Sequence, residues 1–104
     1  MSKEEKKKYL NSYLLQEAKI KRLREMCRIH PERRAEYEKL IDEASALRDK
    51  IEGEIKAVGD DLSVELLYQK YIFGKTLEEI SLILNYSKRH IERLHIKALK
   101  KFGN

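Results

Sequence analysis

The chain has 104 residues, of which 39% are charged and 41% hydrophobic, and its formal net charge is +5. Ala, Glu, Lys, Leu and Arg make up more than half of the sequence, which is typical of long helices. Four glycines and one proline provide little material for β-turns, a single cysteine cannot form an intramolecular disulfide, and no apolar run approaches the roughly 18 residues of a membrane span. We therefore expect an all-α protein with no membrane segment.

The N-terminal residues contain no apolar stretch of the kind found in secretory signals, so we expect the protein to be cytoplasmic. Residues 3–29 lack Gly and Pro and predict one long helix. Its buried stripe follows a spacing of three and four residues. The stripe consists of Tyr9, Tyr13, Gln16, Ile20, Leu23 and Cys27, widened by Leu10, Leu14 and Met26.

His30-Pro31 ends this helix, because proline disfavours a helical conformation in the residue before it. A second helix is predicted over 32–58, with Pro31 at its start and Gly59 at its end. Its stripe consists of Tyr37, Leu40, Ile41, Ala44, Leu47, Ile51, Ile55 and Val58. Two such helices joined by a tight turn predict an antiparallel hairpin over 1–61. Because one seam leaves apolar surface uncovered, we expect the hairpin to pack on the rest of the chain, to dimerise or to dock a partner.

Three further helices are predicted in residues 62–104. The first covers 62–73, capped by Asp61 or Ser63 and ended by Gly74. Thr76 and Glu79 form the pattern of a capping box, which starts the second helix. That helix should point Leu77, Ile80, Ile83 and Leu84 inward. After a break at Asn85-Tyr86, Ser87 caps the third, which should point Ile91, Leu94, Ala98 and Leu99 inward.

Charge is distributed unevenly along these elements. Residues 1–30 carry a net charge of +5, residues 31–61 of −4 and residues 62–104 of +4. The basic end suggests a polyanionic partner, although a solvated helix face would have the same composition. A short helix, a turn and a basic helix are the pattern of a helix-turn-helix, with Ser81 as the small residue where the two helices cross. Lys88, Arg89 and Glu92 would then enter the major groove of DNA.

The sequence from Thr76 to Leu99 resembles the helix-turn-helix of sigma-70 region 4, whose pattern is T-x-x-E-I-A-x-x-L-G-x-S followed by a basic helix ending in A-L. Here Ser81 replaces the usual Ala and Asn85 the usual Gly. Residues 86–99 are also similar to a family of small phage and prophage proteins from Gram-positive bacteria. That resemblance implies a transcriptional regulator similar to activators of phage late genes. It assigns DNA reading to Ser87, Lys88, Arg89, Glu92 and Arg93.

The charge pattern adds backbone contacts at Lys75, Lys97, Lys100 and Lys101. His90 either contacts DNA or packs, whereas His95 is expected to be a core or boundary residue with a hydrogen-bond partner. The candidate DNA-binding residues are Lys75, Thr76, Ser87, Lys88, Arg89, His90, Glu92, Arg93 and Lys97.

Function is thus expected to be sequence-specific binding of double-stranded DNA, with a dimer formed through the hairpin and RNA polymerase as a possible second partner. One alternative is a small terminase-like DNA-packaging subunit, which would form a ring of many subunits. Another is a helical module that binds protein instead of DNA. No nucleophile–base pair, phosphate loop or metal-ligand cluster is visible, so we expect neither an enzyme nor a cofactor.

Overall fold

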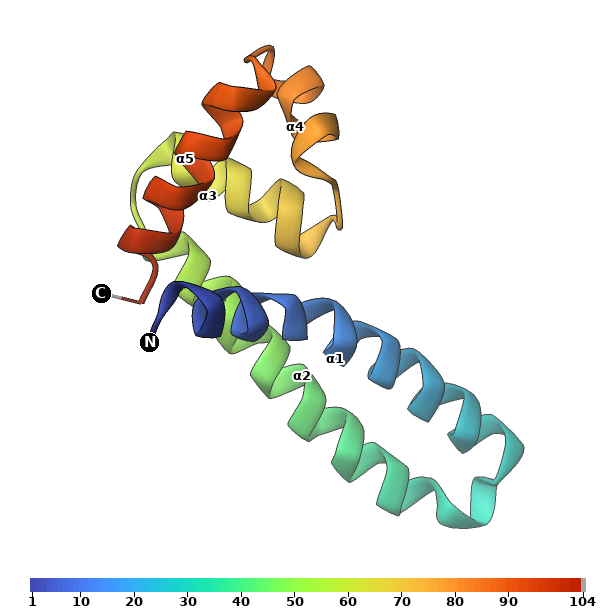
Figure 1. Cartoon of the computed structure of the whole chain (residues 1–104). Helices are drawn as coiled ribbons and strands as arrows, with labels where there is room; N and C mark the ends of the chain where they lie inside the picture. Colours follow the sequence, from blue (N-terminus) through green and yellow to red (C-terminus); the bar gives the residue numbers. More distant parts are fainter. Residues whose placement is uncertain (104) are drawn as a thin grey trace.

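The computed structural model describes residues 1–103, and every regular element in this range is helical (Figure 1). This confirms the all-α prediction. Its elements, in chain order, are α1 (Lys3–Ile29), a 3₁₀ turn η1 (Pro31–Arg33), α2 (Arg34–Lys56), α3 (Asp61–Leu67), a π-helical turn η2 (Tyr68–Ile72), α4 (Leu77–Leu84) and α5 (Lys88–Lys101). Within the described residues, no helix is both long enough and apolar enough to cross a lipid bilayer.

The first two helices form an arm, by which we mean residues 3–56. Ser2 starts α1 with a capping box, in which its hydroxyl accepts from the Glu5 N–H and the Glu5 carboxylate accepts from the Ser2 N–H. At the far end, Pro31 begins the 3₁₀ turn that reverses the chain. Figure 1 shows α2 running back alongside α1 in the opposite direction. The 27 residues of α1 account for most of the 52 Å length of the molecule.

The buried stripes of the arm lie between its two helices, as their spacing indicates. Leu10, Ile20 and Leu23 of α1 are buried, as are Tyr37 and Ile51 of α2. Tyr9 and Cys27 are half-buried at the edges of this seam. Leu14, which the sequence placed on the widened stripe, is 40% exposed because it lies to one side of the contact between the helices.

Two details after the arm differ from the sequence expectations. The helix predicted over 62–73 is α-helical only to Leu67 and continues as a π turn to Ile72. Its cap is Asp60, whose carboxylate accepts from the Ser63 N–H, and neither Asp61 nor Ser63 has this role. Gly74 ends the segment as predicted, with a positive φ of 73°.

One hydrophobic core joins the base of the arm to the C-terminal helices. It contains Leu10, Tyr13, Ile51, Ile55, Leu67, Tyr71, Ala98, Leu99 and Phe102. Lys6 reinforces the junction, because its buried side chain donates from Nζ to the Leu99 carbonyl at 2.8 Å and to the Lys100 carbonyl at 3.5 Å. Carbonyls at the end of a helix lack partners within the helix, so a cation satisfies them and also favours the negative end of the helix dipole. The end of α5 is therefore held by the start of α1.

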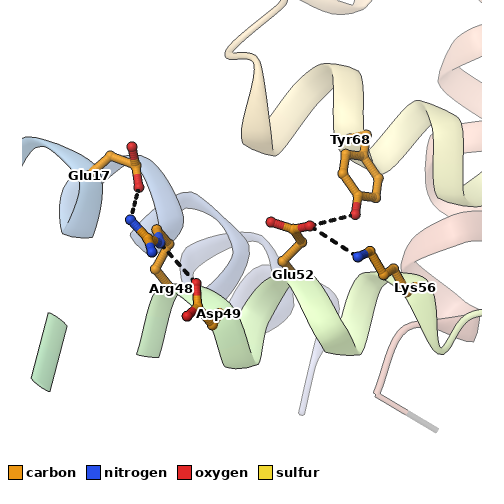
Figure 2. A network of polar contacts seen from close by, with 6 residues as sticks. All are labelled: Glu17, Arg48, Asp49, Glu52, Lys56 and Tyr68. Atoms are coloured by element: carbon orange, nitrogen blue, oxygen red, sulfur yellow. Dashed lines mark hydrogen bonds and ion pairs between the residues drawn. The ribbon is translucent and has the colours of Figure 1, made fainter. Parts of the chain in front are cut away.

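A polar network on the arm supports the same junction (Figure 2). Arg48 of α2 pairs with Glu17 of α1 at 2.9 Å and with its neighbour Asp49 at 3.0 Å. One turn further along α2, the Glu52 carboxylate accepts from the Tyr68 hydroxyl at 2.9 Å and pairs with Lys56 at 3.3 Å. These contacts link α1 to α2 and α2 to the π turn.

Candidate nucleic-acid interface

The first part of the candidate interface is α4, which Thr76 starts as predicted. The Thr76 hydroxyl accepts from the Glu79 N–H at 3.1 Å, and the Glu79 carboxylate accepts from the Thr76 N–H at 3.0 Å. The hydrogen bond from the Thr76 N–H, followed by the Thr76 side chain, lowers the pKa of the Glu79 carboxyl group, so that group is ionised at neutral pH. Ile80 and Ser81 are buried on the inner face. Ser81 is thus a small residue buried on the inner face of α4.

The inward prediction for Ile83 is wrong, because its side chain is 50% exposed. The inner face of α4 is formed by Leu77, Ile80, Ser81 and Leu84, and Ile83 lies outside this arc. A helix of eight residues makes only about two turns, so it can bury one narrow strip against its neighbour.

The turn between α4 and α5 has the conformation that its residues favour. Asn85 adopts the left-handed region, with φ 59° and ψ 43°, which asparagine tolerates better than most residues. The N–H groups of Asn85 and Tyr86 both donate to the Ser81 carbonyl, closing the end of α4. Ser87 then caps α5, with its hydroxyl accepting from the His90 N–H at 3.1 Å.

The inner face of α5 fixes the orientation of the helix. Ile91 packs with Ile80 of α4 and Leu66 of α3, and Ala98 and Leu99 join the main core. His95 is buried as expected, with its Nε2 atom 2.7 Å from the Tyr71 hydroxyl. Burial, followed by the charges of nearby lysines, lowers the pKa of His95 to about 4, so the ring is neutral at pH 7.

The outer face of α5 presents its cations to solvent. Lys88, Arg89, Arg93 and Lys97 are all exposed, and none of them pairs with a carboxylate within residues 1–103. Glu92 lies exposed among them. By contrast, several arginines of the arm and its turn are already paired, such as Arg33 with Glu36 and Arg34 with Glu38. The four cations Lys88, Arg89, Arg93 and Lys97 are therefore available to an external anion.

His90 packs beside this face. It is half-buried, its ring lies edge-on to Tyr86 with centroids 4.8 Å apart, and its Nδ1 atom is 3.4 Å from Arg93 Nη2. These contacts hold the first turn of α5 against the preceding loop and steady the Arg93 side chain.

The remaining predicted residues differ in their positions. Lys75 is half-buried and its charge contributes to the low pKa of Glu79, so it lies near the start of α4. Lys101, expected to contact the DNA backbone, is half-buried and pairs with Asp60 at 3.5 Å, which assigns it to the support of α3.

Sequence reasoning overlooked one exposed residue on this face, Ile96, which is 41% exposed. It follows Arg89, Glu92 and Arg93 at helical spacing, so it lies in line with them along α5. The sequence contained this signal, because Ile96 is an apolar residue at a position where the helical spacing otherwise places charged residues. Such a side chain can contact the methyl group of thymine.

Within the described residues, no three His, Cys, Asp or Glu side chains are grouped as metal ligands would be. Comparison with protein-family models, with curated proteins and with solved structures finds no match to this chain.

Proposed function

We propose that the protein binds double-stranded DNA in a sequence-specific manner, with α4, its turn and α5 acting as a helix-turn-helix. In such a motif the second helix enters the major groove with its N-terminal residues first. The observation that carries this proposal is the outer face of α5, where Lys88, Arg89, Arg93 and Lys97 are exposed and pair with no carboxylate within residues 1–103. These side chains lie on a helix whose opposite face is buried in the core.

The residues of this face divide by the chemistry they offer to DNA. Arg89 can donate two hydrogen bonds to O6 and N7 of guanine, and Glu92 can accept from N4 of cytosine. Lys97, further along α5, is placed for phosphate, which positions a protein without reading sequence. The capped N-terminus of α5 adds free N–H groups and a partial positive charge. Glu92 opposes binding wherever it meets phosphate, so a base partner for Glu92 is part of the proposal.

The biological setting follows from the resemblance to sigma-70 region 4 and to small phage proteins. We propose regulation of phage or prophage transcription in the cytoplasm, by a homo-oligomer, with RNA polymerase as a second partner. Two copies would present two α5 helices to two half-sites.

The salt dependence of DNA binding tests the proposal. Neutralising about four phosphates predicts that the logarithm of the binding constant falls with the logarithm of salt concentration with a slope of about −4. Lys97→Ala should make this slope shallower by about 1 and weaken binding to all sequences alike. Lys39→Ala, which removes an exposed lysine from α2, is the matched control and should leave the slope unchanged. Binding without steep salt dependence, or an equal effect of both substitutions, would contradict the proposal.

A further inference from the structure

The outer face of α4 does not suit DNA. It consists of Glu78, Glu79, Leu82 and Ile83, which are all exposed, whereas the opposite side of the helix is buried against α5 and the π turn. Leu82 is 80% exposed and Ile83 50%. Two carboxylates repel phosphate, and two large apolar side chains side by side favour burial against protein. Figure 1 shows α4 at the edge of the C-terminal helices.

The outer face of α1 has the opposite charge and a similar apolar content. It consists of Leu15, Ala18, Lys19 and Arg22, which follow one another at helical spacing. All four are exposed, with Leu15 at 64%. They line a shallow hollow on the side of α1 turned away from α2. Within residues 1–103, Lys19 and Arg22 pair with no carboxylate.

We propose that the α4 outer face of one copy docks on the α1 outer face of a second copy of this chain. Glu78 would pair with Arg22 of the second copy, and Leu82 would be buried in the hollow beside Leu15. We place the two copies about a two-fold axis, because every copy carries both faces and this symmetry forms the contact twice and closes the assembly as a dimer. The α1–α2 seam already occupies the inner faces of the arm, which leaves the outer face of α1 for this contact.

This inference deepens the self-association in the proposed function and names its surfaces. It does not require DNA binding, because the contact uses neither the outer face of α5 nor its cations. In the dimer, the cations of the second copy would neutralise the carboxylates of α4 before the protein binds DNA.

Charge reversal in two separate proteins tests the contact. In Glu78→Lys, a lysine on α4 faces Arg22 of the other copy, and in Arg22→Glu, Glu78 faces a new glutamate. Each variant alone should therefore dimerise about tenfold or more weakly than the unsubstituted chain, because two pairs turn from attraction to repulsion. Mixing the two variants should restore a dimer, since both contacts in the mixed pair are again between opposite charges. Sedimentation equilibrium of the full chain measures this without DNA.

A second variant and a control make the test independent of charge alone. Leu82→Asp should weaken dimerisation about tenfold or more, and mixing should not rescue it. Glu43→Lys changes an exposed carboxylate of α2 outside the contact and should leave the dimer unchanged. Circular dichroism checks that each variant keeps its helical content.

The inference is overturned if the unsubstituted chain stays monomeric from micromolar to millimolar concentration, or if mixing fails to restore the dimer. A restored dimer without salt-dependent DNA binding would uphold this contact and reject the proposed function. Salt-dependent DNA binding by a monomer would uphold DNA binding and reject this contact.

Discussion

At the scale of single residues, His95 makes the stability of the core depend on pH. Its imidazole is buried against Tyr71, and burial raises the pKa of that tyrosine to about 12. The tyrosine hydroxyl is therefore protonated and can donate to Nε2 of the neutral ring. Lys70, Lys7 and Lys3 add positive charge nearby and further disfavour an imidazolium. The site is thus built for an uncharged histidine.

The stability of the fold should consequently fall as pH is lowered from 6.5 toward 4. The folded-state pKa of about 4 lies below the ordinary value of 6.5, so within this range the unfolded chain binds more protons. The loss between pH 7 and pH 5 should be about 2 kcal/mol in the free energy of unfolding. Urea titrations at both pH values measure it, and His95→Gln, which keeps a hydrogen-bonding side chain without titrating, should remove most of the difference.

The window from pH 7 to pH 5 isolates this residue from the capping carboxylates. Glu5, Asp60 and Glu79 have lowered pKa values, so their contributions are lost only at more acidic pH. An unsubstituted chain equally stable at pH 7 and pH 5, or an equal loss in His95→Gln, would show that His95 is not the group responsible.

At the scale of elements, local rules predict the caps and turns well. Thr76, Ser87 and Asn85 act as their sequence context suggests, because a capping box or a left-handed turn involves residues only three or four positions apart. The π turn after Leu67 was not predicted, since the apolar spacing of 62–73 is also that of an α-helix. The outward position of Ile83 depends on which strip of α4 meets α5, and that is decided by tertiary packing.

The contact between Lys6 and the end of α5 was equally beyond sequence reasoning, because its partners are more than ninety residues apart. Nothing near Lys6 distinguishes it from the neighbouring lysines at positions 7 and 8. Once it is seen, however, it explains how a helix with a basic last turn is anchored.

Lys6→Met should therefore lower the free energy of unfolding by about 1–3 kcal/mol, since it keeps the apolar stem of the side chain but removes the donor to the buried Leu99 carbonyl. Lys8→Met removes an exposed lysine from the same helix and should have little effect. Urea unfolding followed by circular dichroism compares the two. If both variants lose the same stability, the hydrogen bonds from Lys6 are not what holds the end of α5.

At the scale of the whole molecule, the net charge of +5 is the sum of basic and acidic surfaces that lie on different elements. The arm carries much of its charge in internal pairs such as Glu17–Arg48, and α4 presents carboxylates and apolar groups. The outer face of α5 presents Lys88, Arg89, Arg93 and Lys97, which pair with no carboxylate within residues 1–103. The basic composition of this segment is visible in the sequence, but the fold decides which cations pair with a carboxylate. Lys101, for example, pairs with Asp60. The fold also separates the face proposed for DNA from the face proposed for a second copy.

The most direct test of the central claim is selection of bound sites from random duplex DNA, carried out in parallel with the unsubstituted chain and with Arg89→Ala. We expect the unsubstituted chain to enrich one motif. Arg89→Ala should bind less tightly and lose preference at the position where Arg89 reads guanine, at a cost of about 1–3 kcal/mol. Failure of the unsubstituted chain to enrich any motif would contradict sequence-specific binding, and an identical motif and affinity in Arg89→Ala would contradict the role assigned to α5.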